Sequence, residues 1–145
     1  MLTSWLVFGL FSYAANINWK EKPLSHIVEI KTEVRDVAAA QAACQRLKLE
    51  PPVEGKTRLF SGEVEGLAVH LRDWRYPVVF ETGTGRAHFD NFNERWGKRV
   101  ELDRYQQIYG VEKAKLEVRR AGHSVYEQPQ EDGSIKLTVQ VGGAA

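Results

Sequence analysis

Aromatic and arginine side chains alternate in a short stretch near the middle of the chain, Arg72-Asp73-Trp74-Arg75-Tyr76. A guanidinium group beside an aromatic ring can stack with the bases of single-stranded nucleic acid. The same residue types are frequent anchors of protein–protein interfaces, where Trp, Tyr and Arg are enriched. We therefore define a candidate binding surface that consists of Arg72, Trp74, Arg75, Tyr76 and Trp96.

The four histidines do not have the spacing of a metal site. They are His26, His70, His88 and His123. A zinc site needs three or four converging ligands, and the sequence has neither a helical His pair nor a Cys-x-x-Cys motif. We expect no metal, no cofactor and no assigned catalytic residue. An enzyme is kept as a third hypothesis, in which His70, His88 and Asp90 converge in one pocket.

Two further features have structural interpretations. Cys44 falls in the apolar stripe of a predicted helix, so we expect a buried thiol rather than a nucleophile. Residues 90–97 are rich in Asp and Asn, but Phe92 occupies the third position, where a calcium loop needs an oxygen ligand. We therefore predict that this segment is a structured turn.

The composition is that of an ordinary globular protein. The 145 residues include 20 Lys and Arg against 19 Asp and Glu, a net charge of +1, and 43% are hydrophobic. This balance argues against a strongly basic nucleic-acid-binding surface, although a local patch is compatible with it. The single cysteine excludes an intramolecular disulfide.

The first 24 residues differ from the rest of the chain. Residues 5–11 form an apolar run, and no charged residue precedes Lys20. The run is shorter than the ~20 apolar residues that cross a membrane, and it lacks the basic segment with which a signal peptide begins. We predict that residues 1–24 are an apolar leader outside the domain and that residues 25–145 form a single domain. We expect no membrane span and a cytoplasmic location.

From residue 26 the periodicity of the sequence predicts a strand and then a helix. Residues 26–35 alternate apolar and polar side chains, which is typical of a half-buried strand. Asp36 has the position of an N-cap, and the apolar residues after it recur with helical spacing. Pro51-Pro52 is expected to end this segment.

Short apolar runs separated by glycine then predict an antiparallel meander. We expect a hairpin of residues 58–64 and 67–74 that turns at Glu65-Gly66. A central strand follows at residues 78–80, and another is expected at residues 86–89.

The last third of the chain predicts a long helix and a second hairpin. The helix spans residues 100–121, since its apolar side chains have helical spacing and its terminal charges match the helix dipole. The hairpin turns at Asp132-Gly133. The order strand, helix, strands, helix, hairpin predicts an α+β fold in which two helices pack on a largely antiparallel sheet.

Two blocks of the sequence resemble a known protein family. Residues 105–125 read YQQIYGVEKAKLEVRRAGHSV, and residues 131–141 read EDGSIKLTVQV. Together with the Ser-His strand at residues 25–32, they resemble the family of unknown function numbered twelve fifty-seven, which includes the plastid and cyanobacterial reading frame numbered thirty-five. The loop at residues 91–97 is similar to the family's bacterial branch. The resemblance covers about residues 25–143, implies no catalytic motif, and implies that the first 24 residues lie outside the domain.

We rank two classes of function above the enzyme hypothesis. The first is a non-catalytic adaptor or regulatory module that binds a partner protein, because the aromatic residues are accompanied by no nucleophile–base arrangement. The alternative is a single-stranded nucleic-acid-binding module that uses Arg72, Trp74, Arg75 and the cations of the second helix. Those cations are interspersed with Glu112 and Glu117, so we favour a solvated face of mixed charge, formed by Lys113, Lys115, Arg119 and Arg120.

Overall fold

The structure is a computed structural model that describes residues 3–8 and 27–142. His26, residues 143–145 and the predicted leader apart from residues 3–8 lie outside the described residues. The elements, in chain order, are β1 (Thr3–Phe8), β2 (Val28–Lys31), α1 (Val37–Arg46), β3 (Val53–Arg58), β4 (Glu63–Val69), β5 (Val78–Glu81), β6 (Arg86–Phe89), α2 (Arg99–Arg120), β7 (Ser124–Pro129) and β8 (Ile135–Gln140). Neither α1 nor α2 combines the length and the hydropathy that a membrane crossing requires, in so far as the chain is described.

The strands form two antiparallel sheets. The first has five strands in the order β2-β6-β5-β4-β3, and the second has three in the order β1-β8-β7. Strands β3 to β6 are neighbours in sequence and in space, which confirms the predicted meander. Its first strand covers residues 53–58 rather than the predicted 58–64, and β5 is the central strand of the five-stranded sheet. The final hairpin turns where predicted and pairs with β1, so part of the predicted leader is a strand beside β8.

The turn between β3 and β4 lies at residues 59–62, so the turn predicted at residues 65–66 is wrong. Leu59 N donates to Gly62 O at 2.7 Å and closes the turn. Gly66 instead pairs with Gly55 inside the ladder of β3 and β4. Glycine is needed there for another reason, because a Cβ at position 66 would lie 2.6 Å from the carbonyl oxygen of Phe80 on β5.

The second predicted strand of this hairpin is also shorter than expected. β4 ends at Val69, whereas the sequence pattern predicted a strand to residue 74. The intervening Asp73 has a φ of 62°, a left-handed conformation that a continuous ladder does not contain. Residues 70–77 therefore form a loop rather than a strand.

Helix α1 begins at its predicted cap. The Asp36 carboxylate accepts a hydrogen bond from Ala39 N at 3.2 Å. The hydroxyl oxygen of Tyr109, on α2, accepts from Arg35 N at 3.0 Å and from Asp36 N at 2.9 Å. The start of α1 is thus fixed by its own cap and by a side chain of the second helix.

Helix α1 ends before Pro51-Pro52, so the predicted stop is wrong. Lys48 adopts the left-handed conformation with a φ of 59°. Its N–H donates to Gln45 O at 3.2 Å, and the N–H of Leu49 donates to Cys44 O at 2.8 Å. These are the two hydrogen bonds of a Schellman motif, which satisfies the last carbonyls of a helix without any proline.

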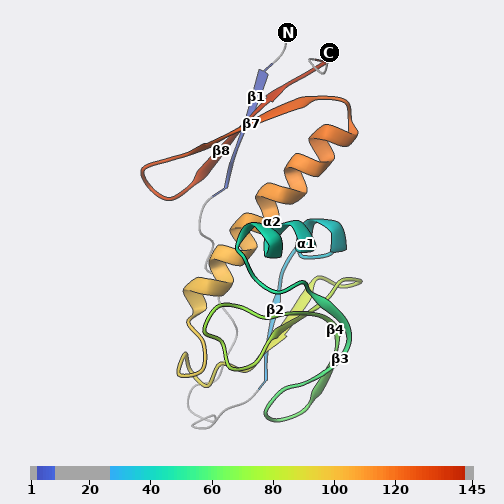
Figure 1. The fold of residues 1–145 in the computed structure, drawn as a ribbon, viewed down its shortest axis with the longest axis vertical. Coiled ribbons are helices and arrows are strands. Elements are labelled where there is room, and N and C mark those ends of the chain that lie inside the picture. Colours follow the sequence, from blue (N-terminus) through green and yellow to red (C-terminus); the bar gives the residue numbers. More distant parts are fainter. Residues whose placement is uncertain (1–2, 9–26, 143–145) are drawn as a thin grey trace.

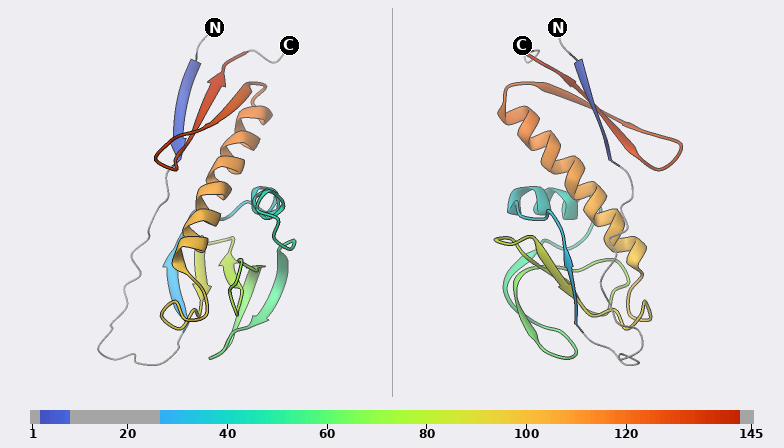
Figure 2. Two further views of the ribbon diagram at one scale, coloured as in Figure 1. Left: turned by 60° about the vertical axis from the view of Figure 1, so that its left-hand side comes forward. Right: turned by 180° about the vertical axis from the view of Figure 1, so that it is seen from behind.

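Helix α2 links the two sheets. Its N-terminal half and α1 pack against the five-stranded sheet, and its C-terminal half extends to the second sheet (Figures 1 and 2). An α-helix of 22 residues spans about 33 Å, more than the length of the strands on which it packs. The helix therefore carries the final hairpin beyond the first sheet, where it cannot extend the meander.

One face of the five-stranded sheet forms the core with both helices, which confirms the predicted fold class. Its buried apolar side chains are Val28, Ile30, Leu67, Val69, Val78, Phe80, Ala87 and Phe89. Cys44 of α1 is 1% exposed, as predicted, and burial raises the pKa of its thiol. The Tyr105 hydroxyl donates to Ala40 O at 3.1 Å, so α2 is also bonded to the middle of α1.

Candidate functional site: an aromatic cluster and a basic pocket

Two loops of the structure carry most of the predicted binding residues. One lies between β4 and β5 at residues 70–77, and the other lies between β6 and α2 at residues 90–98. Arg75 N donates to Trp96 O at 2.8 Å, and the indole N–H of Trp74 donates to Lys98 O at 3.0 Å. The two loops are therefore held together as one unit.

The second loop contains a left-handed turn. Phe92, Asn93 and Glu94 have φ angles of 44°, 51° and 68°. Each non-glycine residue in this region costs about 1 kcal/mol, so the surrounding contacts must hold the turn. The Asn91 side chain spans it by donating to Gly97 O at 3.1 Å. The structured turn predicted at residues 90–97 is thereby confirmed.

An aromatic cluster, which we define as Phe60, Tyr76, Phe92 and Trp96, forms where these loops meet the tip of the β3–β4 hairpin. Trp96 lies at its centre, with ring centroids 4.8 Å from Phe92, 5.2 Å from Phe60 and 5.6 Å from Tyr76. Phe60 is 55% exposed although it contacts Trp96. The cluster is thus packed within itself and open to solvent at the hairpin tip.

Two guanidinium groups lie over the rings of this cluster. Arg75 Cζ is 4.8 Å from the centroid of the Trp96 ring and 5.7 Å from that of Tyr76. Arg95 Cζ is 4.9 Å from the Phe92 ring. Neither arginine has a carboxylate partner within the described part of the chain. The cluster therefore combines apolar rings with positive charge that no acidic side chain neutralises there.

The structure brings together three of the five predicted surface residues. Arg75, Tyr76 and Trp96 meet in the aromatic cluster, whereas Trp74 lies beneath it, packs on the core and contacts Phe89 at 5.6 Å between centroids. Arg72 points to a different site. Phe60 was not among the predicted residues, because the hairpin turn was predicted five residues too late in the sequence. Phe92 had served only to exclude a calcium loop.

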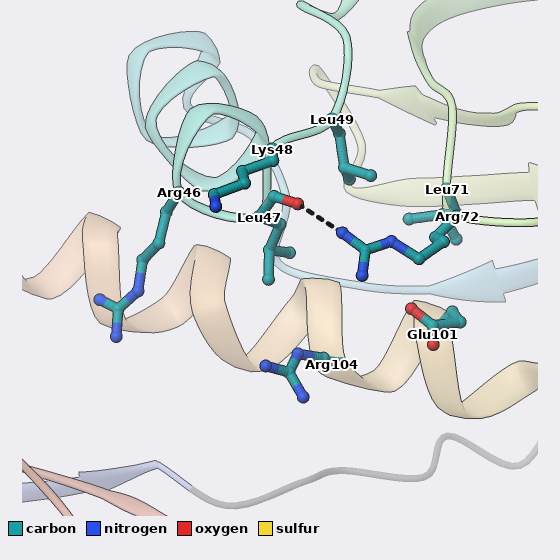
Figure 3. Close-up of a pocket in the computed structure, with 8 residues that line it drawn as sticks. All are labelled: Arg46, Leu47, Lys48, Leu49, Leu71, Arg72, Glu101 and Arg104. Atoms are coloured by element: carbon teal, nitrogen blue, oxygen red, sulfur yellow. Dashed lines mark hydrogen bonds between the residues drawn. The ribbon is translucent and has the colours of Figure 1, made fainter.

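Arg72 belongs to a basic pocket of about 350 Å³ between the end of α1, the loop after β4 and the start of α2 (Figure 3). Its Nη2 donates to Leu47 O at 3.2 Å. Three leucines, Leu47, Leu49 and Leu71, contribute apolar surface, and Glu101 is its one carboxylate. The cationic side chains that line this pocket are Arg46, Lys48, Arg72 and Arg104.

These four cations differ in their partners. Arg46 forms ion pairs with Glu112, at 3.1 Å, and with Glu127. The side chains of Lys48 and Arg104 have no hydrogen-bond or ion-pair partner among residues 27–142. With Arg72 bonded only to a neutral carbonyl, three positive charges of the pocket have no anionic partner in that part of the chain.

The residues of the enzyme hypothesis have separate environments. His70 is exposed, and the partly buried His88 ring lies between Glu29 and Glu81, with N–O distances of 3.7 and 3.5 Å. The buried Asp90 carboxylate accepts from Phe92 N at 3.3 Å and so supports the left-handed turn. Residues 27–142 contain no group of three His, Cys, Asp or Glu side chains placed to hold a metal ion.

The cations of α2 form a face of mixed charge, as predicted. Lys113 Nζ lies 2.8 Å from both Asp36 Oδ2 and Glu117 Oε1, and these contacts raise the pKa of the lysine. Lys115 Nζ lies 2.9 Å from Glu127 Oε2. Lys113 and Lys115 are therefore paired with carboxylates, unlike Lys48 and Arg104 of the basic pocket.

No protein-family model matches the chain, and neither a curated protein nor a solved structure matches it significantly. The family resemblance of residues 25–143 stays a prediction.

Proposed function

We propose that the chain is a non-catalytic protein-binding module whose interaction surface is the aromatic cluster. The observation that supports this proposal is Phe60, which is 55% exposed while it packs 5.2 Å from the centre of the cluster at Trp96. The other three rings are only partly buried, so the exposed ring of Phe60 continues into an aromatic surface that solvent still reaches, and such surfaces mark interaction sites. Clustered Trp, Tyr and Arg side chains also provide the strongest anchors of protein interfaces.

The charge around the cluster indicates the chemistry of the partner. Arg75 and Arg95 lie over aromatic rings without carboxylate partners in residues 27–142. A partner segment with an apolar side chain flanked by Asp or Glu would cover the rings and pair with both guanidinium groups. We therefore expect a partner with an acidic, apolar segment, and binding that weakens as salt increases.

A capture experiment with two matched variants tests this proposal. Phe60→Ala removes the exposed ring of the cluster, and Tyr126→Ala removes a 61% exposed ring on β7, outside the cluster. The wild-type chain and Tyr126→Ala should retain the same partner from native lysate, and Phe60→Ala should lose it while keeping the same circular dichroism spectrum. Equal retention by both variants, or the absence of any specific partner, would contradict the proposal.

Single-stranded nucleic acid is the second candidate ligand of the same cluster. The observation in its favour is Arg75 at 4.8 Å over the Trp96 ring, since bases stack on such pairs in a sequence-tolerant way. Fluorescence anisotropy of a labelled oligothymidylate tests it, with binding expected at low salt, a steep loss at higher salt and weaker binding by Trp96→Ala. An unchanged anisotropy at low salt would eliminate this candidate.

A further inference from the structure

The basic pocket shares no residue with the aromatic cluster and is formed by three segments distant in sequence. Figure 3 shows Lys48 and Leu47 from the end of α1, Arg72 from the loop after β4, and Arg104 from α2 around the same space. Its volume of about 350 Å³ lies in the range of small-molecule sites. The pocket is thus large enough for a ligand of a few functional groups.

The positive charges that line the pocket favour the binding of an anion. Lys48 and Arg104 have no ionic partner among residues 27–142, and Arg72 donates to the neutral carbonyl of Leu47. Like charges around one space repel one another, and the single carboxylate of Glu101 is too little to balance them. An oxyanion would accept hydrogen bonds from two planar guanidinium groups and an ammonium group.

The backbone of Lys48 gives a second, independent observation. Lys48 occupies the position after a helix end that glycine normally fills, with a φ of 59°. The Schellman motif needs only the backbone of this residue, so its hydrogen bonds do not explain a lysine there. Lys48 is part of the lining of the pocket, and a residue with a strained backbone and a charged side chain at such a place is typical of a ligand-binding position.

We propose that the basic pocket binds an oxyanion, a phosphate or a carboxylate, carried by a small molecule with an apolar body. Arg72 and Arg104 hold the oxyanion through paired N–H groups, and Lys48 adds a point charge. The apolar body of the ligand covers Leu47, Leu49 and Leu71, which line the same space. This binding site goes beyond the proposed protein-binding function and does not depend on it.

A nuclear magnetic resonance titration of the full chain tests the ligand class. The probes are phenyl phosphate, benzoate and benzyl alcohol, which share a ring and differ in their polar group. We expect saturable amide shifts at Lys48, Leu49, Arg72 and Arg104 with one or both anions and none with the alcohol. The tighter anion identifies the preferred oxyanion. The absence of saturable shifts up to about 10 mM of either anion, or equal shifts with the alcohol, would overturn the proposal.

Three variants separate the pocket from general surface charge. Lys48→Gly removes the ammonium group and suits the backbone, so this variant should be more stable than the wild type while it binds the anion at least about tenfold more weakly. Arg104→Gln should weaken binding to a similar extent. Arg119→Gln removes an exposed arginine of the same helix outside the pocket and should leave the affinity unchanged. Unchanged affinity in both pocket variants, or equal weakening in the control, would contradict the site.

Discussion

Trp74 packs so closely against Gly97 that a Cβ at position 97 would lie 2.6 Å from the Cε2 and Cγ atoms of the indole. The indole N–H also donates to Lys98 O, so the ring is fixed by a hydrogen bond next to this contact. Arg75 follows Trp74 in the chain, and Trp96 precedes Gly97. The contact therefore fixes the two loops that carry Arg75 and Trp96 relative to each other.

Gly97→Ala should destabilise the protein by about 2 kcal/mol, because the added methyl group overlaps the indole and must displace it. The measurement is urea unfolding monitored by circular dichroism. Gly83→Ala is the matched control, since a Cβ there would meet no atom within 4 Å, and its effect should stay within about 0.5 kcal/mol. Equal unfolding midpoints for the two variants would show that the contact does not constrain the loops.

Tyr109→Phe should lower the free energy of unfolding by about 1–2 kcal/mol. The lost hydroxyl accepts from Arg35 N and Asp36 N, and both partly buried N–H groups would lack their partner in the variant. Tyr126→Phe is the control, because its ring is 61% exposed on β7, and it should change stability by less than about 0.5 kcal/mol. Chemical unfolding of both variants under the same conditions measures the two changes in the free energy of unfolding. An unchanged free energy of unfolding in Tyr109→Phe would mean that water replaces the hydroxyl.

The elements predicted well are those whose signals are local. Asp36 caps α1 as expected, and the alternation of residues 28–34 places Val28, Ile30 and Val34 in the core. The turn at residues 65–66 was predicted wrongly because glycine occurs both in tight turns and where a neighbouring strand approaches the backbone closely. Gly66 permits the close approach of β5, a contact with Phe80 that the local sequence does not contain.

The candidate site was predictable only in part, for the same reason. Arg75 and Tyr76 are neighbours in the chain, so their composition was informative, but Phe60 reaches Trp96 only through the tip of the β3–β4 hairpin. The basic pocket combines residues separated by more than fifty positions, from Lys48 to Arg104. No periodicity or motif links such residues, since their meeting depends on how α2 crosses α1.

Asp36→Asn should reveal a pH-dependent contribution to stability. Hydrogen bonding by Lys113 is the main cause that holds the pKa of Asp36 below its ordinary value of 3.8. Such a group stabilises the fold fully above its unfolded-state pKa, and this stability is lost as the pH falls through the lower folded-state value. Asparagine keeps the N-cap, so the variant isolates the charge.

At neutral pH the Asp36→Asn variant should be less stable by under about 1 kcal/mol, because the ion pair is partly exposed. The difference should shrink as the pH falls below 3.8. Urea unfolding of both proteins across this range is the measurement. A difference of constant size down to the lowest pH at which both are folded would assign the effect to the cap rather than to the charge.

Gln106 and Gln107 are adjacent on α2 and should respond oppositely to the same substitution. Both side-chain polar atoms of Gln106 are buried and have no hydrogen-bond partner within the described residues, whereas Gln107 Nε2 donates to Gly133 O at 2.9 Å. Burial of an amide without partners is unfavourable, so Gln106→Leu should raise the free energy of unfolding by about 1–2 kcal/mol. Gln107→Leu should lower it by a similar amount, because it leaves the β7–β8 turn without that bond. Thermal and urea unfolding of the two variants measure the sign of each change in the free energy of unfolding. Destabilisation by Gln106→Leu would mean that an ordered water satisfies the amide.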